Sequence, residues 1–379
     1  MTFEVYATTW SDPHPIEQIP ATNLEMSFPL SNHGECSFSA TVEPGRSFWR
    51  PALSAAMSGV LVCSDGVPVW SGQMMSESQT GPRTYDLSFA EWGSFFEQVP
   101  AKPFVAADTN DHVLFRKLII DAQAVAGQDC GIVFGSTLGA SVSDLTIHAW
   151  DSTTVEEEFR RLGEHAGGPE WYVDANRNLV LGDRLGSVTP VAVVEYVADT
   201  QAYAAPELPP ALTLLGSLFP GQQPYAVVGG RRGGNVISHP ARQQSPGITV
   251  AVAVGAGEES AQRRRPATAD VLLAAGYPRK TKLAQYTDVT NLATLQKHAN
   301  ADLTAASGMT TGYTLSCFGS DPDWTSIARG DTVRVELDTD VYATGQPLVF
   351  NTRVLEVAVR VPDTGPVEVN YVCANVRDY

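Results

Sequence analysis

The chain has 379 residues, of which 25 are basic and 42 acidic, and its formal net charge of −17 disfavours wrapping around nucleic acid through phosphate contacts. The same charge is compatible with a wall along which DNA slides, because like charges do not adhere. A hydrophobic content of 43% is ordinary for a globular protein, and the length allows two to four domains, each with its own core.

The cysteines indicate a reducing compartment. They are odd in number and widely spaced, without a C-x-x-C pair, so we expect them to be reduced and unpaired; they are Cys36, Cys63, Cys130, Cys317 and Cys373. Met1-Thr-Phe-Glu resembles no signal peptide, and the longest apolar run, near Ile248 to Val254, is too short to span a bilayer.

Residues 1–98 predict a first β-domain. Phe38, Ala40 and Val42 alternate with polar neighbours, which is the period of a strand with one buried face. The domain is expected to end in the aromatic stretch Trp92–Phe96, as a strand or turn that closes a barrel.

Residues 99–190 predict a small α+β domain. Asp108-Thr109-Asn110 offers caps for a helix with one apolar face, and Ser152 is expected to cap a second helix. Glu156–Glu158 would occupy the first turn of that helix, where the dipole favours acidic side chains. Trp171–Leu181 predicts a hairpin.

Residues 191–235 and 311–379 predict a second β-domain, divided by an α+β insertion at residues 236–310. The first part is expected to hold strands at Val191–Tyr196 and Tyr225–Val228, separated by a Pro-rich arm at Pro206–Pro224. The insertion predicts a strand at Gly247–Val254, a basic loop at Arg263-Arg264-Arg265 and a helix after Asp288. The apolar face of that helix would carry Leu292, Leu295, Ala299 and Leu303.

The last stretch, Thr311–Tyr379, shows the period of two throughout, and the order of its features also appears in Ser37–Asp86. Each copy has an alternating strand, a loop with a Trp, a Gly-led strand, a Pro before an aromatic strand and a Thr-Gly-Pro turn. The matched residues include Trp49 with Trp324, Trp70 with Phe350, Thr80–Pro82 with Thr364–Pro366, and Tyr85–Leu87 with Val369–Tyr371. The preserved order favours an internal duplication over coincidence between two antiparallel sheets.

No catalytic constellation stands out. The seven histidines form neither an H-E-x-x-H motif nor an i, i+4 pair; they are His14, His33, His112, His148, His165, His239 and His298. His33-Gly34-Glu35-Cys36 has metal-ligating side chains, but a turn before a strand is the favoured interpretation. Asp108–Asp111 lacks the Gly and Glu of a calcium loop and is interpreted as a helix cap.

The remaining candidates are interpreted as structural. Gly135–Gly139 does not match the nucleophile elbow G-x-S-x-G. Gly229–Gly234 does not match a P-loop, and a flexible loop is favoured over a phosphate or DNA contact. Arg263–Arg265 is interpreted as a solvated loop rather than a site for an acidic partner. The tryptophans are interpreted mostly as core residues rather than as a sugar-binding platform; they are Trp10, Trp49, Trp70, Trp92, Trp150, Trp171 and Trp324.

Several short motifs, taken in order, carry a resemblance to a known family. They are Gly66–Gln73, Gly255–Glu258, Tyr277–Arg279, Asp288–Thr290 ahead of Leu292–Ala306, Gly330–Val335 and Arg353–Val357. Through them the chain resembles the tail hub proteins of tailed phages, called minor tail protein, baseplate hub or tail-associated protein. It is most similar to those of long-tailed phages of actinobacteria. The resemblance covers nearly the whole chain.

The resemblance implies a mainly β fold with two related antiparallel β-barrels of the tail-tube type and two smaller α+β domains. It implies a homotrimer at the tail tip, because three copies with two barrels each match a six-fold tube. The implied partners are the distal tail or tube protein, the tape measure protein and other tip or central fibre proteins. DNA would pass through the channel without specific binding. The implied location is the virion, after assembly in the host cytoplasm.

Two other hypotheses stay open beside the structural one. A receptor- or glycan-binding module would need clustered exposed aromatics, for which Tyr277 and Tyr286 are thin support. A cell-wall hydrolase would need a carboxylate pair in a cleft, and some hub proteins carry a peptidase or lysozyme extension. This chain stops at Tyr379, after its final strand, so we expect no enzyme and no cofactor, catalytic or metal site.

Overall fold

The computed structural model describes most of the chain. The described residues are 1–43, 58–135, 139–164, 168–196, 236–238, 241–244, 248–257, 262–274, 276, 278–286, 289–306, 310–320, 322–337, 348–374 and 376–377. Trp49, the Pro206–Pro224 arm, the strand expected at Tyr225–Val228 and the Gly229–Gly234 loop lie outside them.

The N-terminal part is made of strands, as its alternating pattern predicts. They are β1 (Phe3–Thr9), β2 (Glu17–Ile19), β3 (Ala21–Pro29), β4 (Glu35–Thr41), β5 (Ser58–Ser64), β6 (Val67–Gln79) and β7 (Thr84–Glu91). Phe38 and Ala40 are buried, while the residues between them face the other side of β4. The aromatic stretch expected to close a barrel is instead a 3-10 helix, η1 (Trp92–Gln98).

The C-terminal part is also made of strands. They are β13 (Ala192–Tyr196), β14 (Val236–Ser238), β15 (Ala241–Gln244), β19 (Thr310–Phe318), β20 (Thr332–Leu337), β21 (Leu348–Val361), β22 (Glu368–Cys373) and β23 (Val376–Arg377), with a short 3-10 helix η3 (Trp324–Ser326). The turn predicted at Asp363–Pro366 connects β21 to β22, and Gly365 adopts a φ of 115° there.

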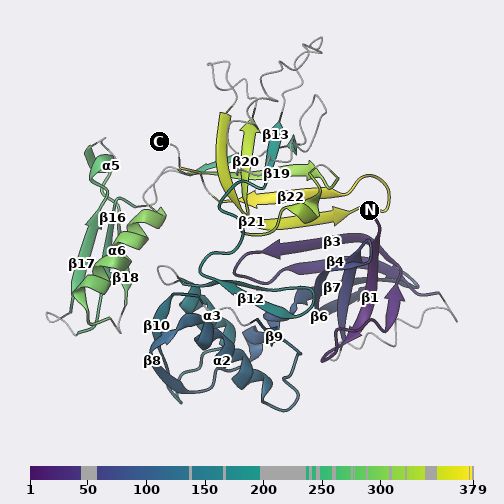
Figure 1. Cartoon of the computed structure of the whole chain (residues 1–379), viewed down its shortest axis with the longest axis horizontal. Coiled ribbons are helices and arrows are strands. Elements are labelled where there is room, and N and C mark those ends of the chain that lie inside the picture. The colour runs from purple at the N-terminus through teal and green to yellow at the C-terminus, as the bar shows by residue number, and fades with distance from the viewer. Residues whose placement is uncertain are drawn as a thin grey trace, which may run out of the picture.

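The strands from the two ends of the chain form one sheet (Figure 1). Its order is β14-β19-β22-β21-β3-β4-β7-β6-β5-β1-β2, and the two parts meet where β3 pairs antiparallel with β21, Leu24 opposite Val361 and Pro29 opposite Glu356. One hydrophobic core packs beneath both parts. The fold is therefore mainly β with a large antiparallel sheet. Two separate barrels are not confirmed, because no closed barrel forms among the described strands.

The two parts share connectivity and register. The order β3-β4-β7-β6-β5-β1 corresponds to β14/β15-β19-β22-β21-β20-β13. Trp70 pairs with Val62 as Phe350 pairs with Val335, which confirms one sequence match. Phe38 corresponds to Leu315, since each lies opposite the matched Leu87 or Tyr371. The sequence alone favours matching the alternating run Phe38, Ala40 and Val42 with Tyr313, Leu315 and Cys317, and that match is two residues off.

The repeat departs from symmetry at its last strand. β1 runs antiparallel to β5, whereas β13 runs parallel to β20. A second likeness extends to side chains: Ser39 Oγ lies 2.6 Å from Asp86 Oδ1, and Ser316 Oγ lies 2.5 Å from Asn370 Oδ1 at the equivalent positions.

Residues after η1 form an α+β region with its own core. Its elements are β8 (Phe104–Asn110), α2 (Asp111–Gln123), β9 (Val133–Phe134), β10 (Val142–Ile147), α3 (Val155–Glu164), β11 (Glu170–Val173) and β12 (Asn178–Gly182). Asn110 caps α2 by accepting a hydrogen bond from the His112 amide. The cap of α3 is Thr154, not Ser152, because Thr154 and Glu157 form a reciprocal capping box.

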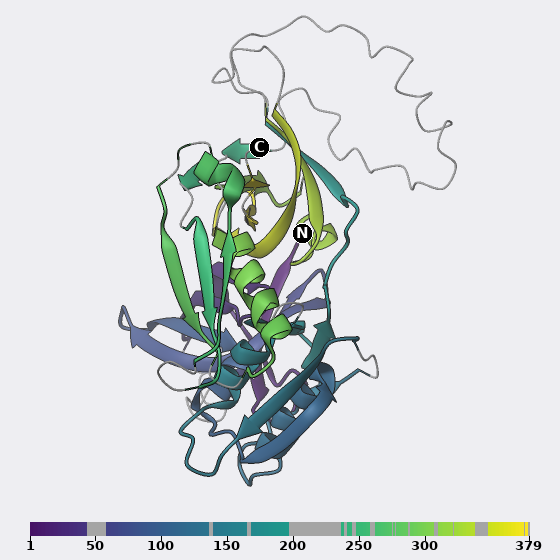
Figure 2. The ribbon, with the colours of Figure 1, turned by 90° about the vertical axis from the view of Figure 1, so that its left-hand side faces the viewer.

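The insertion is a small three-stranded sheet covered by a helix, which Figure 2 shows lying along the strands. Its elements are β16 (Val250–Val254), β17 (Arg264–Thr268), α5 (Asp270–Ala274), β18 (Thr281–Gln285) and α6 (Leu292–Ala306). Leu295 and Ala299 are fully buried, as the apolar face of α6 predicts. The basic loop prediction is wrong in part, because Arg264 and Arg265 begin strand β17.

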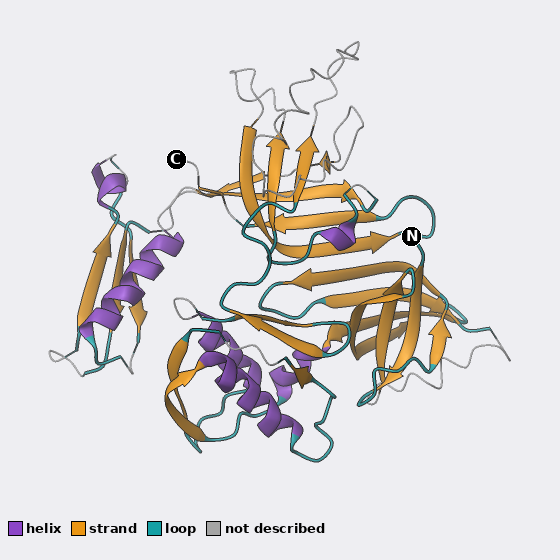
Figure 3. Ribbon diagram, in the orientation of Figure 1, coloured by secondary structure: helices purple, strands orange, loops and turns teal. Residues whose placement is uncertain are grey.

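Strands dominate the molecule, as the colouring of Figure 3 makes plain. All five cysteines are free and buried, which confirms their prediction. Among the described helices, none is long and apolar enough to cross a membrane.

Candidate functional site

The joined sheet has two chemically different faces along β3, β4, β7, β21 and β22. Met26 and Phe28 in β3 and Val357 in β21 point to the buried core. The residues that alternate with them along these strands therefore point to the opposite face. That face, here called the polar face, consists mainly of small polar and acidic side chains. Its residues are Glu25, Ser27, Glu35, Ser37, Asp86, Ser88, Glu356, Ala358, Arg360, Glu368 and Asn370.

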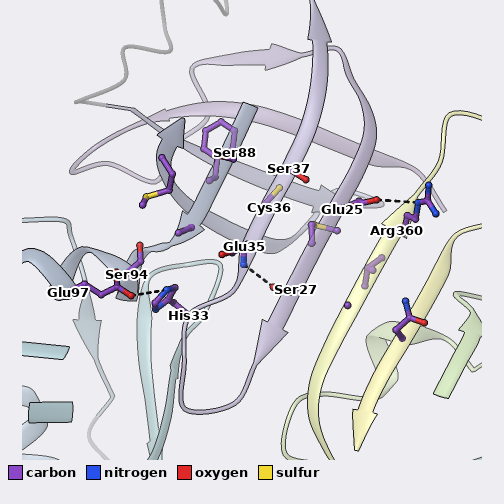
Figure 4. A pocket seen from close by; sticks show the side chains of 17 residues that line it. Glu25, Ser27, His33, Glu35, Cys36, Ser37, Ser88, Ser94, Glu97 and Arg360 are labelled. Atoms are coloured by element: carbon purple, nitrogen blue, oxygen red, sulfur yellow. Dashed lines mark hydrogen bonds and ion pairs between the residues drawn. The ribbon is translucent and has the colours of Figure 1, made fainter. Parts of the chain in front are cut away.

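A hollow of about 640 Å³ opens on the polar face where the two ends of the chain meet (Figure 4). β3, β4 and β7 line it from one side, and β21 and β22 from the other. At its edge, His33 Nε2 lies 3.1 Å from Glu97 Oε1, and the Glu35 amide donates to Ser27 Oγ at 2.9 Å. The hollow is open to solvent rather than an enclosed cavity.

The charges on the polar face are mostly negative. Arg360 Nε lies 3.2 Å from Glu25 Oε1, and Arg360 Nη1 lies 4.0 Å from Glu368 Oε2. All three side chains are more than 40% exposed, so these ion pairs contribute little to stability. Burial, and then the charge of Glu35, raise the pKa of the Glu356 carboxyl. The surface thus repels anions and offers few donors to hold a phosphate backbone.

Glu35→Gln is expected to stabilise the protein slightly, by less than about 0.5 kcal/mol at about pH 7, because it removes a like charge from Glu356. A raised folded-state pKa means that stability is lost as pH rises through that pKa. The gain should therefore vanish at about pH 4, where the Glu356 carboxyl, whose pKa is raised, is largely protonated and no longer repelled by a neighbouring charge. Urea unfolding at the two pH values measures it, and a variant less stable than wild type at the higher pH would contradict it.

Three arginines fix the α+β region against both halves of the sheet. Arg329 is 7% exposed and pairs with buried Glu91, at 3.0 Å from Nη2 to Oε1. Arg353 makes a bidentate pair with Glu170 and donates to the Leu185 carbonyl at 2.7 Å.

Arg177 is 1% exposed and donates to the carbonyls of Thr9, Trp10 and Cys130. Burial lowers the pKa of its guanidinium to about 10, which leaves it charged at neutral pH. Together the contacts of the three arginines join the α+β region to β1, β3, β7 and β21.

The sequence candidates are not brought together into a site. Glu35 and Cys36 point to opposite faces of β4, so the stretch from His33 cannot act as one ligand set and is a turn before a strand, as interpreted. Among the described residues, no group of three His, Cys, Asp or Glu side chains could hold a metal. Ser136, Thr137 and Leu138 lie outside the described residues, as do His165 and His239.

The tryptophans are mostly core residues, as predicted. Trp70, Trp92, Trp171 and Trp324 are buried. Trp10 is half-buried, and Trp150 is the most exposed of the described tryptophans: it is 78% exposed and stacks on His148 with ring centroids 4.5 Å apart. In the insertion, Tyr286 stacks on His298 and its hydroxyl donates to Asp302, so it does not extend an exposed aromatic cluster.

Sequence reasoning missed the arginine contacts and the polar face. Glu91 ends β7 and Arg329 lies in the turn before β20, places where a charged residue ordinarily indicates solvent, and no local pattern marks them as buried. The polar face was readable in part, since Ser, Glu and Asn occupy the alternate positions of β3, β4 and β22. The pattern could not show that these three strands belong to one sheet and therefore place their polar residues on one face.

Comparison with known proteins gives the fold. No protein-family model matches the chain, and no curated protein matches it in sequence. It is similar to the tail protein from Neisseria meningitidis MC58, with a TM-score of 0.67 and 13% identity over 98% of this chain and 96% of that one. It is also similar to the 43 kDa tail protein of prophage MuSo2 from Shewanella oneidensis, with a TM-score of 0.62 and 13% identity over 99% and 98% of the two chains.

A third structure is the prophage tail protein gp18 from Listeria monocytogenes EGD-e, with a TM-score of 0.58 and 9% identity over 97% and 94% of the two chains. At such identities the likeness is one of fold. The chain thus has the fold of phage tail proteins along nearly its whole length, which confirms the resemblance to tail proteins of phages found in its sequence motifs.

Proposed function

We propose that this chain is a structural tail-tip or baseplate hub protein of a tailed bacteriophage, and that three copies form a ring which terminates or continues the tail tube and its DNA channel. The observation that carries the proposal is the pairing of β3 with β21, which joins two strand units of equal connectivity into one sheet. Each chain then supplies two of six similar positions around an axis, so three chains complete the ring.

The polar face is proposed as the channel wall. Its uncharged positions hold mainly small hydroxyl and amide side chains, and its excess of carboxylates disfavours adhesion of DNA. A hub must let DNA pass, so a wall without a binding site is what the task requires. The domains proposed for this ring are 1–98 and 191–235 with 311–379, with 99–190 and 236–310 attached outside it.

The proposed partners follow from this position. The distal tail or tube protein would contact one face of the ring, and other tip or central fibre proteins the opposite face, with the tape measure protein inside. The proposed location is the virion, after assembly in the host cytoplasm. An enzyme is disfavoured, because the similar structures are tail proteins and no catalytic motif emerges from the described residues.

Purified protein is expected to assemble into particles with three times the 40.6 kDa mass of one chain. Light scattering measures the mass, and negative-stain images should show a ring with a central hole. A strict monomer at every protein concentration, or a ring of six chains, would contradict the proposal.

The receptor- or glycan-binding alternative has one observation in its favour, the exposed indole of Trp150 stacked on His148. It lies in the α+β region just after β10 and is not among the residues of the polar face. That function would be favoured if the protein binds host cells or immobilised glycans and if Trp150→Ala abolishes the binding while the variant still forms the ring.

A further inference from the structure

The two long strands β21 and β6 occupy equivalent places and can be aligned residue by residue. Arg353 is the last residue of β21 paired with β20, and Gln73 is the last residue of β6 paired with β5. Each strand then has a bulge two residues later, at Leu355 and at Met75, before it pairs onward with its hairpin partner. The bulged residues are both exposed apolar side chains, 39% and 51%.

In β21, the half beyond the bulge is covered on both edges. One edge pairs with β22, and the other receives β3, with Glu356 opposite Pro29 and Val359 opposite Met26. This is the junction between the two strand units of one chain. It is a backbone contact, in which an edge strand of one unit extends the sheet of the other.

The equivalent half of β6, from Ser76 to Gln79, pairs with β7 alone among the described strands. The strands equivalent to β3 are β14 and β15, since Ala21 pairs with Ala40 as Val236 pairs with Cys317, its counterpart. Among the described strands, β15 pairs with β19 alone. Among the described strands, each chain therefore has one edge of each kind without a strand partner.

We propose that β15 of one copy pairs antiparallel with the outer half of β6 in the next copy, repeating between chains the contact that β3 makes with β21 within a chain. This inference rests on the proposed ring and names the surface that closes it. Transfer of the internal register places Ser76 opposite Gln244, Ser78 opposite Arg242 and Gln79 opposite Ala241 of the neighbouring copy. The ring would then be held together by the same kind of strand pairing at every junction, both within a chain and between neighbouring chains.

Compared with the junction inside the chain, both strands of the proposed contact replace an apolar residue with a polar one at the same paired position. Inside the chain, Phe28 lies opposite Val357 and both are buried. At the equivalent positions of the proposed contact stand Gln243 and Glu77, a polar pair in place of an apolar pair. Polar edges keep the free chain soluble before assembly, because an exposed apolar edge strand promotes aggregation.

A disulfide placed across the proposed contact tests the register. The Leu30 amide donates to the Leu355 carbonyl, so these two residues form a hydrogen-bonded pair. Because hydrogen-bonded and non-hydrogen-bonded pairs alternate along the ladder, Ser27 and Ala358, three pairs further on, form a non-hydrogen-bonded pair, whose Cα atoms lie closer together. Ser78 and Arg242 are the equivalents of that pair. The double variant Ser78→Cys/Arg242→Cys, oxidised in the full chain, is expected to run as a covalent trimer without reductant. The five native cysteines are buried and should not compete.

The matched control is Ser78→Cys/Gln244→Cys, displaced by two residues along the strand, where the Cα atoms are too far apart for a disulfide. Each single variant is a second control, and none of these should give the trimer band. If the protein has trimer mass but the Ser78/Arg242 pair stays uncrosslinked or links as readily as the displaced pair, the edge assignment is wrong and the ring stands. If the mass is that of a monomer and no crosslink forms, both are overturned.

Gln79→Pro tests the same edge independently. Thr80 donates its amide to the Thr84 carbonyl of β7, so by alternation the Gln79 amide points to the open edge. Proline removes that donor and leaves the hairpin ladder intact. Gln79→Pro is expected to lower the trimer population at least tenfold while Gln79→Ala leaves it unchanged. A trimer that tolerates the proline as well as the alanine would overturn the proposal.

Discussion

Arg329→Met is expected to reduce the free energy of unfolding by about 3–5 kcal/mol, because it leaves the Glu91 carboxylate buried without its cation. The Arg329 guanidinium also donates to the Pro29 carbonyl at 2.8 Å and stacks on Tyr172, 4.0 Å from the ring centroid. Arg329 lies in the turn between η3 and β20, so these contacts join that turn to β3, β7 and the hairpin of β11 and β12. Their loss should therefore loosen the α+β region from the sheet as well as destabilise it.

Urea unfolding of the purified chain measures the change. The matched control is Arg334→Met, which removes a cation paired with Glu336 at 2.7 Å on the exposed surface and should cost less than about 0.5 kcal/mol. The double variant Glu91→Gln/Arg329→Met should recover part of the loss, since no buried charge remains. Equal losses in the buried and exposed variants would show that the Glu91 pair contributes no more than a surface pair.

The alternating pattern predicted the strands well, because burial of one sheet face imposes its period directly on the sequence. The positions of Val333, Val335 and Leu337 are buried as their alternation indicates. The correspondence of Trp70 with Phe350 and of Leu87 with Tyr371 also survives, since these positions face the shared core in both parts of the sheet. The features of the fold that follow from burial could thus be predicted from the sequence.

The joining of the two parts could not be predicted in the same way. The β3–β21 contact is made by backbone hydrogen bonds between Leu24–Pro29 and Glu356–Val361, and backbone groups carry no side-chain code for their partner. The α3 cap shows a smaller failure of the same kind: Ser152 and Thr154 are both good caps, and only Glu157, three residues after Thr154, distinguishes them.

The buried arginines show what could not be predicted about the site from the sequence. Arg329 gains its burial from Pro29, Glu91 and Val173, which come from three distant parts of the chain. No window of sequence contains that environment. A charged residue becomes a core residue here because several backbone carbonyls and one carboxylate converge on it, which compensates the desolvation of its charge.

Arg177→Asn is expected to cost about 3 kcal/mol or more, because it removes one guanidinium that satisfies three backbone carbonyls. The Nη2 to Thr9 oxygen distance is 2.9 Å, and the guanidinium lies 3.9 Å from the Trp92 ring centroid. Asparagine suits the test because Arg177 has a φ of 62°, a left-handed conformation that asparagine tolerates better than most residues. The turn between β11 and β12 is therefore kept while the contacts are lost.

Arg177→Lys separates charge from geometry, since a lysine ammonium keeps the positive charge but cannot reproduce the planar fork that reaches Thr9, Trp10 and Cys130. It should recover less than half of the loss. Arg83→Asn at an exposed position is the control and should change stability by no more than about 0.5 kcal/mol. Native-state hydrogen exchange should show β1 and the α+β region opening together in Arg177→Asn, because this side chain links them. Unchanged exchange at Thr9 and Trp10 would mean that the link is made elsewhere.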